Sequence, residues 1–391
     1  MSAPTVPAGG VPAATTRGIF DPDLLSTCIS CGFCLPVCPT YRLTGDERSS
    51  PRGRITLMRA LETGRLDEDD PTLLEQSSYC LGCRACEPVC PAGVQYGELL
   101  EQWRDHQWRG RRGPVLVAGL RLGVRKALPL SLAGAVRRHA STTGPARPPE
   151  PAGSWPAAAS APPQDSMQLM LGCFERSLFP GVSKAVARLL PGIEIPSGQG
   201  CCGALHAHNG DSAGGRQMAH ELGEALPRTI LTTAGGCATH IAHELGRDRV
   251  VELSEYLASS WVDDPTSTAA RLRRLTKDGR PLRVTVQDSC HLRNGLGTHR
   301  QPREVAGLVA EVVELPSAGS CCGAAGTYSV VRPKDSAAVL APKLDEIEAL
   351  GVDHVVAVNP ICQRQLIGGL RKRKSPVTVL HLAELMAQAM P

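Results

Sequence analysis

The chain has 391 residues, a length typical of two or three domains. Hydrophobic residues make up 42% and charged residues 20%, which allows packed cores and excludes a chain that is disordered throughout. The 42 basic and 38 acidic residues give a net charge of +4, too balanced to indicate a nucleic-acid-binding protein. No run of about 18 apolar residues predicts a membrane span, and Met1–Thr16 lacks the regions of a signal peptide. We therefore expect a cytoplasmic protein.

The cysteines are the unusual feature of the composition. The chain has 16 of them, and every one falls into a spacing that occurs twice. In a small secreted protein such cysteines would form disulfides, but this chain is large and carries no export signal. We therefore expect thiols, metal ligands or redox groups.

The first eight cysteines form two quartets with the spacing C-x2-C-x2-C-x3-C-P. In two-cluster ferredoxins three closely spaced thiolates hold one [4Fe–4S] cluster, the fourth holds the other cluster, and the proline after it ends the local helix. Two zinc sites are the alternative, but zinc ribbons pair two C-x2-C units and need no third cysteine. The predicted ligands are Cys28, Cys31, Cys34 and Cys90 for the first cluster, and Cys80, Cys83, Cys86 and Cys38 for the second.

The region around and between the quartets is predicted to be helical. Pro51–Glu62 (PRGRITLMRALE) has apolar residues at steps of three and four, with helix start and stop signals at its ends. Leu73–Gln76 and Glu98–Trp108 are also predicted to be helical. This part of the chain is therefore expected to be an α-helical ferredoxin. Three of its arginines either offset the negative charge of the clusters or form a solvated basic face: Arg52, Arg54 and Arg59.

A basic segment and a linker are predicted to follow the ferredoxin domain. Basic residues recur between His106 and Pro149 without an acidic one, and apolar residues interleave with them over Val115–Val136. This pattern suits a membrane surface, an acidic partner or packing on the chain's own domain, and the sequence leaves all three open. The stretch Ala140–Gln164 is rich in Pro, Ala, Ser and Gly, so it is predicted to be a linker.

The rest of the chain contains a repeat. Each copy has a cysteine, a Cys-Cys-Gly triplet and a further cysteine, at offsets of 117 to 125 residues. Apolar runs alternate with helical patterns in both copies, which predicts two α/β units with parallel strands and sites at the carboxyl ends of those strands. The cysteines are Cys173, Cys201, Cys202 and Cys237 in the first copy, and Cys290, Cys321, Cys322 and Cys362 in the second.

The sequence therefore predicts an α+β multidomain protein, with an N-terminal α-helical ferredoxin that holds two [4Fe–4S] clusters and a duplicated α/β cysteine-rich (CCG) domain. The expected boundaries are 1–17 for a flexible tail, 18–108 for the ferredoxin domain, 109–164 for the basic segment and linker, 165–262 for the first CCG repeat and 280–391 for the second.

The quartets, the PRGRI stretch between them and the two C…CCG…C repeats resemble the iron–sulfur subunit of bacterial glycolate oxidase. They also resemble related lactate-utilisation and heterodisulfide-reductase iron–sulfur proteins. The segments CCGAAGTYSV (321–330) and SYCLGCRACEPVCPAGV (78–94) are most similar to the glycolate oxidase member. The resemblance implies an electron-transfer subunit of an oxidoreductase complex, located in the cytoplasm or peripherally at the inner face of the cell membrane.

The resemblance also implies partner subunits that bind FAD and oxidise a 2-hydroxy acid, with electrons then passing through the clusters towards the quinone pool. This chain has no Gly-rich dinucleotide fingerprint after a strand, so FAD and the catalytic residues are expected on the partner and not here. The alternatives are an iron–sulfur subunit of a D-lactate dehydrogenase, a heterodisulfide-reductase-like thiol–disulfide oxidoreductase subunit, and a zinc-stabilised binding module.

The CCG repeats depart from the heterodisulfide-reductase pattern, which ends in C-x2-C and supplies a fifth thiolate. The corresponding positions here are His240 and Gln365. Each repeat is therefore expected to bind an ordinary [4Fe–4S] cluster or zinc, or to keep free thiols. The second repeat is favoured for a cluster because three glycines surround its CCG triplet and His291 follows Cys290. Three histidines either tune the cysteines through hydrogen bonds or are ordinary surface residues: His206, His208 and His291.

Overall fold

The computed structural model describes residues 16–108, 167–262 and 272–391. The predicted basic segment and linker over 109–164, and all but the last two residues of the predicted tail, lie outside these ranges.

Residues 16–108 form helices and loops. The helices are α1 (Pro22–Ser26), α2 (Pro39–Thr44), η1 (Glu47–Ser49), α3 (Pro51–Glu62), α4 (Pro71–Tyr79) and α5 (Tyr96–Trp108). The predicted helix over Pro51–Glu62 is confirmed to the residue, because Ser50 caps it by accepting a hydrogen bond from Gly53 N and Pro51 occupies its first position. The core between α3, α4 and α5 includes Met58, Leu73 and Trp103.

The next part of the chain builds a parallel three-stranded sheet in the order β1-β2-β3. An isolated parallel bridge joins Gln168 to Glu194 on the side of β1 away from β2. The strands are β1 (Gln168–Leu169), β2 (Ile230–Thr232) and β3 (Val250–Glu252). The helices are α8 (Cys173–Leu178), α9 (Pro180–Leu189), α10 (Ala204–Ala207), α11 (Ser212–Ala225), α12 (Gly235–Leu245), η3 (Arg247–Arg249), α13 (Leu253–Leu257) and η4 (Ala258–Val262).

The last part builds a parallel four-stranded sheet in the order β7-β6-β8-β9, preceded by an antiparallel pair. The strands are β4 (Thr276–Lys277), β5 (Arg280–Pro281), β6 (Arg283–Gln287), β7 (Glu311–Val312), β8 (His354–Ala357) and β9 (Thr378–His381). The helices are η6 (Leu292–Leu296), α14 (Gln301–Gly307), α15 (Tyr328–Val331), α16 (Pro333–Ala349), α17 (Pro360–Lys372) and α18 (Leu382–Ala389).

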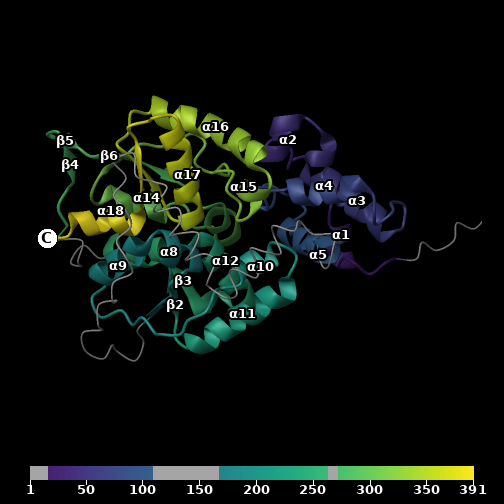
Figure 1. Ribbon diagram of the computed structural model, residues 1–391, viewed down its shortest axis with the longest axis horizontal. Helices are drawn as coiled ribbons and strands as arrows, with labels where there is room; N and C mark the ends of the chain where they lie inside the picture. The colour runs from purple at the N-terminus through teal and green to yellow at the C-terminus, as the bar shows by residue number, and fades with distance from the viewer. Residues whose placement is uncertain (1–15, 109–166, 263–271) are drawn as a thin grey trace, which may run out of the picture.

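The two sheet-containing parts share one hydrophobic core. Val182 and Val186 of α9 belong to the same buried cluster as Leu385 and Met386 of α18. Figure 1 shows α1 to α5 at one end of the molecule, with α5 beside α10 and α4 beside α15. Within the described residues, no helix combines the length and apolarity that a membrane span requires.

Hydrogen bonds join the ferredoxin helices to both sheet-containing parts. Glu101 of α5 lies 2.7 Å from His208 Nδ1, and Arg104 donates to the His208 carbonyl at 2.8 Å. On the other side, Arg332 pairs with Glu75 of α4 at 2.6 Å. The cysteines of all three parts are thereby held in fixed positions relative to one another.

Candidate iron–sulfur centres

The loop that carries the first three cysteines also meets the end of the second quartet. Cys28, Cys31 and Cys34 line a cavity of about 30 Å³ together with Cys90 and Cys86. Cys90 is distant in sequence, so only the folded chain brings it to the first three cysteines.

Cys38 lies with the cysteines of the second quartet. Burial raises the pKa of the Cys86 thiol, and the negative charges of Cys83, Cys80 and Cys38 raise it further. Burial likewise raises the pKa of Cys83, with additional contributions from Cys80 and Cys38. Cys38 is the N-cap of α2, and Pro39 is the first residue of that helix. Here the proline begins a helix and does not end one as expected, because its fixed φ suits the first helical position.

The two three-cysteine loops have the same backbone conformation. Left-handed φ angles occur at Ser30 (57°) and Gly32 (91°) in the first loop, and at Gly82 (63°) and Arg84 (58°) in the second. These are the third and fifth positions of each C-x2-C-x2-C segment. The repeated spacing therefore corresponds to a repeated pattern of left-handed backbone positions.

Buried cations lie next to the second quartet. Burial alone would lower the pKa of the Arg54 guanidinium, but the negative charges of Cys80, Tyr96 and Cys38 outweigh this and hold the pKa above its ordinary value. Arg104 is also buried, and it donates to the carbonyl oxygens of Cys80 at 2.6 Å and Ser77 at 3.0 Å. Thiolates that carry a cluster of net negative charge are compatible with these cations.

In the first sheet-containing part, the four predicted cysteines come together at the carboxyl ends of β1 and β2. Cys173 begins α8, and Cys237 lies in the first turn of α12. The Sγ atoms of Cys173 and Cys201 are 3.6 Å apart, and those of Cys202 and Cys237 are 3.0 Å apart.

The second sheet-containing part brings its four cysteines together in the same way. The Sγ atoms of Cys322 and Cys362 are 3.1 Å apart. Hydrogen bonding with Cys290 and Cys322 raises the pKa of Cys321. The amide N–H of Gly323 donates to Cys321 Sγ at 3.4 Å.

The glycine of each CCG triplet is required by the backbone. Gly203 has φ of 84° and Gly323 has φ of 80°, a region that L-residues rarely adopt. A Cβ on Gly203 would lie 2.1 Å from the Gly215 carbonyl oxygen, and one on Gly323 would lie 2.5 Å from the Ser336 carbonyl oxygen. Each triplet can therefore turn its two thiols into the site only because its third residue has no side chain.

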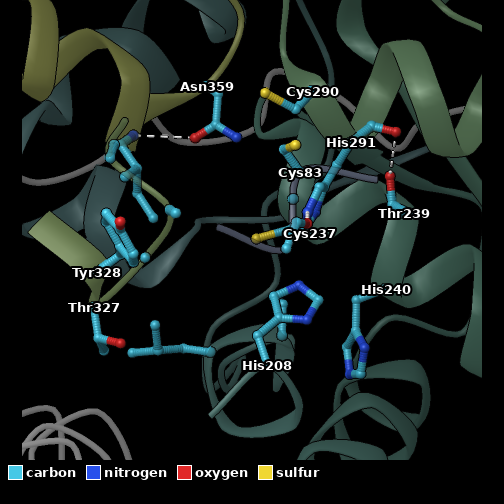
Figure 2. A pocket seen from close by; sticks show the side chains of 18 of the residues that line it. Cys83, His208, Cys237, Thr239, His240, Cys290, His291, Thr327, Tyr328 and Asn359 are labelled. Atoms are coloured by element: carbon cyan, nitrogen blue, oxygen red, sulfur yellow. Dashed lines mark hydrogen bonds between the residues drawn. The ribbon is translucent and has the colours of Figure 1, made fainter. Parts of the chain in front are cut away.

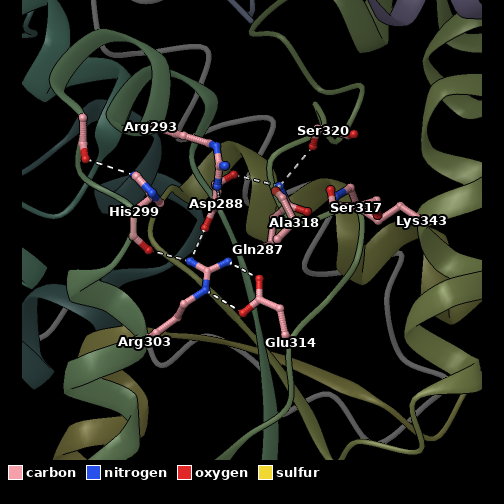
Figure 3. Close-up of polar contacts among 11 residues, drawn as sticks. Gln287, Asp288, Arg293, His299, Arg303, Glu314, Ser317, Ala318, Ser320 and Lys343 are labelled. Atoms are coloured by element: carbon pink, nitrogen blue, oxygen red, sulfur yellow. Dashed lines mark hydrogen bonds and ion pairs between the residues drawn. The ribbon is translucent and has the colours of Figure 1, made fainter. Parts of the chain in front are cut away.

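Polar contacts hold the loops that carry the second set of cysteines (Figure 3). Asp288 follows β6 and is buried between Arg293, at 2.6 Å, and Arg303, at 2.7 Å. Gln287 donates to the Ala318 carbonyl at 3.1 Å, in the loop before Cys321. These contacts position Cys290 and the CCG triplet relative to one another.

Lys343 is a residue that the sequence analysis missed. It is buried on α16, its ammonium donates to the Ser317 carbonyl, and burial lowers its pKa although the negative charges of Cys322, Cys290 and Cys321 act to raise it. Lys343 lies on the face of α16 that carries Leu340, Leu344 and Ile347. This spacing could have identified it from the sequence, because a lysine among buried apolar residues requires a partner.

A cavity of about 180 Å³ lies between the three parts, lined by both sets of CCG cysteines and by Cys83. Figure 2 shows Tyr328 on one side of this cavity and Cys237 and His291 on the other. Among the described residues, no three or more His, Cys, Asp and Glu side chains are spaced closely enough to hold a single metal ion.

Of the three histidines near the cysteines, His206 is buried, which corrects the expectation that it is an ordinary surface residue, whereas His208 and His291 are half-buried. His206 is buried and lies 2.8 Å from Asp211, and His208 pairs with Glu101. His291 Nε2 donates to the Gly82 carbonyl at 3.0 Å, and burial lowers its pKa to about 3.

His240 is buried with its Nε2 3.3 Å from the Gly215 carbonyl. At the other departure from the heterodisulfide-reductase pattern, Gln365 donates to Ser336 Oγ at 2.8 Å.

The comparisons with known proteins cover nearly the whole chain. A family model described as "4Fe-4S dicluster domain" matches residues 24–94, and one described as "Cysteine-rich domain" matches both 167–242 and 284–367. The chain is 35% identical to the "Probable glycolate oxidase iron-sulfur subunit" of Bacillus subtilis (strain 168), over 95% of each protein. It is 30% identical to the "Glycolate oxidase iron-sulfur subunit" of Escherichia coli (strain K12), over 96% of each.

A more distant similarity extends over the same length. The chain is 25% identical to one of the subunits of the fumarate reductase (CoM/CoB) of Methanothermobacter marburgensis, over 98% of this chain and 76% of that protein. Together these matches agree with the resemblance drawn from the cysteine motifs.

Proposed function

The chain belongs to the family of glycolate oxidase iron–sulfur subunits, and we propose that it carries electrons from a flavin-containing subunit that oxidises a 2-hydroxy acid towards an acceptor of the quinone class. It is the electron-transfer subunit of an oxidoreductase complex, and the oxidation of the hydroxy acid takes place on the partner subunit. The thiol sets hold iron–sulfur clusters, which accept and release one electron at a time when bound.

We assign the first cluster to Cys28, Cys31, Cys34 and Cys90, and the second to Cys80, Cys83, Cys86 and Cys38. The first assignment is supported by the cavity that Cys28, Cys31, Cys34 and Cys90 line together. The second is supported by the charges of Cys83, Cys80 and Cys38, which raise the pKa of the Cys86 thiol. The backbone amide of Gly82 donates to Cys80 Sγ at 3.4 Å and the Tyr96 hydroxyl donates to the same sulfur at 3.7 Å. Hydrogen bonds of this kind stabilise a thiolate ligand and raise the reduction potential of its cluster.

The CCG domain is proposed to be a duplication over 165–262 and 280–391, after a ferredoxin domain over 18–108. Both sheets are parallel, and the Glu194 bridge beside β1 matches the place of β7 beside β6. A further cluster is assigned to Cys290, Cys321, Cys322 and Cys362, because Lys343 supplies a buried positive charge next to this set. The set Cys173, Cys201, Cys202 and Cys237 is the weaker site for a cluster.

One observation carries the proposal: the second quartet lies against the second CCG set. The Cys83 thiol is close enough to Cys290 for the Cys290 charge to raise its pKa, and Asn294 donates to the Cys83 carbonyl at 2.9 Å. The thiol sets therefore form a continuous series from the exposed Cys31 to the interior of the protein. Such a series suits one-electron steps between neighbouring clusters.

Iron analysis and reduction by substrate test the proposal. Protein purified anaerobically with its partner subunits is expected to contain more than eight irons per chain, and its clusters to be reduced when glycolate or another 2-hydroxy acid is added. Replacing Cys321 and Cys322 by Ala is expected to lower the iron content and to leave the two N-terminal clusters intact. Clusters that no 2-hydroxy acid reduces would contradict the electron-transfer role, and an iron content of eight in both proteins would contradict the third cluster.

A further inference from the structure

The loop of the first three cysteines (Cys28–Cys34) presents apolar side chains to solvent. Within the described residues, Ile29 is 67% exposed and Phe33 is 65% exposed. Pro91, which is also exposed, lines the same small cavity. We call Ile29, Phe33 and Pro91 the first-loop patch. Single exposed apolar residues are common, but these three surround the site assigned to the first cluster.

The backbone holds Ile29 and Phe33 in these positions. Ser30 and Gly32 have left-handed φ angles, and Arg52 donates to the Ser30 carbonyl at 3.1 Å. Arg52 is itself fixed by an ion pair with Glu47 at 2.6 Å. A Cβ on Gly32 would lie 2.7 Å from Arg52 Nη1, so the arginine packs directly on the loop. The loop therefore cannot easily turn its apolar side chains inward.

The second loop (Cys80–Cys86) has the same backbone conformation and is already used as a contact surface. Leu81, which occupies the position of Ile29, is only 7% exposed because it packs against Cys321 and Tyr328 of the second CCG repeat. The carbonyl oxygens of Gly82 and Cys83 accept hydrogen bonds from His291 at 3.0 Å and Asn294 at 2.9 Å. Leu81, Gly82 and Cys83 thus connect the loop of the second assigned cluster to the repeat that carries the third.

The first loop has the same left-handed backbone positions as the second, but no described segment packs on it as the second CCG repeat packs on the second loop. Its apolar side chain at the matching position is exposed, and no described group donates to the Cys31 carbonyl, the counterpart of the Cys83 carbonyl. All 16 cysteines lie in the described ranges, and Cys31 is the one that is exposed. Because electron transfer between proteins requires a short distance, this is the place where a redox partner gains the closest approach.

We propose that the first-loop patch is the docking surface for the flavin-containing subunit and the point where electrons enter the chain. The inference rests on the proposed function and names the face that the partner covers. The partner is expected to pack an apolar surface on Ile29 and Phe33 and to donate a hydrogen bond to the Cys31 carbonyl, as the second CCG repeat does at Leu81 and Cys83. Aromatic residues, Phe among them, are enriched at protein–protein interfaces, so the exposed Phe33 is the expected anchor of this contact.

The test compares the full, cluster-loaded chain with the double variant Ile29→Ser, Phe33→Ser. We expect at least about tenfold weaker binding to the purified flavin-containing subunit and a similar loss in the rate of cluster reduction by glycolate through that subunit. Dithionite needs no docking surface, so its reduction of the clusters is expected to be unchanged. The iron content is expected to be unchanged too, which separates a failed contact from a lost cluster.

The matched control is the double variant Leu74→Ser, Val330→Ser, which removes two other exposed apolar residues (41% and 42% exposed). It is expected to bind the flavin-containing partner as the unmodified chain does. The proposal is overturned if both double variants weaken binding equally, or if the first-loop variant binds normally. It is also overturned if the first-loop variant changes only self-association or only binding to anionic lipid vesicles.

The experiment also distinguishes this inference from the proposed function. If the unmodified chain contains clusters that glycolate reduces through the flavin-containing partner, the proposed function holds whatever the variants do. If glycolate never reduces the clusters of the unmodified chain, the proposed function fails, and binding of the two variants to that partner still decides whether the first loop is a docking surface.

Discussion

Arg54 Nη2 donates a hydrogen bond to the Thr40 hydroxyl at 3.1 Å, and that hydroxyl lies 3.3 Å from Cys38 Sγ. The arginine is fully buried. Its Nε donates to the Gln76 carbonyl at 3.0 Å, and within the described residues no carboxylate forms an ion pair with it. The thiolates of Cys38 and Cys80 are the negative groups that face it.

Replacing Arg54 by Gln is therefore expected to lower the reduction potential of the cluster assigned to the second quartet. A unit charge about 6 Å away at an effective dielectric constant of about 20 corresponds to a shift of roughly 100 mV. The measurement is a redox titration followed by electron paramagnetic resonance. Arg48→Gln, which removes an exposed arginine paired with Asp46, is the control and is expected to cause no shift. An equal shift in both variants would show that Arg54 has no special role.

Replacing single cysteines tests the exchange of fourth ligands. Cys90→Ser is expected to alter the spectrum of the cluster held by Cys28, Cys31 and Cys34, because these thiols share a cavity with Cys90. Cys38→Ser is expected to alter the other cluster. Mössbauer and electron paramagnetic resonance spectra of the two variants distinguish the clusters. If Cys90→Ser altered the cluster of its own quartet and left the other intact, the exchange would be wrong.

Gly323→Ala is expected to destabilise the second CCG loop by at least about 2 kcal/mol, because the new Cβ meets the Ser336 carbonyl and the backbone has a left-handed φ. Loss of iron from the second CCG set is expected with it. Gly368→Ala is the control, since that glycine lies inside α17 with no atom near the added Cβ. The control is expected to be neutral or stabilising by about 1 kcal/mol. Thermal unfolding and iron analysis measure both effects.

The buried Glu252 carboxyl is expected to make the free energy of unfolding depend on pH. Burial raises its pKa to about 8, although Ser254 donates to it and opposes this shift. The folded pKa lies above the ordinary value, so the unfolded chain releases the proton first, and stability falls as pH rises from about 4.5 to about 8. At pH 9 the variant Glu252→Gln is expected to be more stable than the unmodified chain, on the order of 2 kcal/mol.

Denaturant unfolding at pH 6 and at pH 9 measures this difference. The control is Glu311→Gln on the exposed part of β7, which is expected to change stability equally little at both pH values. A Glu252→Gln variant whose advantage did not grow with pH would contradict a buried, protonated carboxyl at this position.

The cysteine groups and the helix over Pro51–Glu62 were predictable from the sequence because both depend on residues close together in the chain. The spacing of a C-x2-C-x2-C segment places three thiols within one short loop, and Ser50, Pro51 and the apolar steps determine where the helix begins and which face it buries. The repeat of cysteines and CCG triplets was visible for the same reason.

Contacts between distant segments were not predictable in this way. Arg52 and Arg54 are two residues apart in one basic helix, yet Arg52 is half-exposed and pairs with Glu47, whereas Arg54 is buried beside Cys38 and Cys80. Ile29 and Leu81 occupy the same position of one motif, yet only Leu81 is covered by the second CCG repeat. Local spacing determines which residues can bind a cluster, but burial and charge environment depend on which remote segment packs against each loop, and that is decided only when the whole chain has folded.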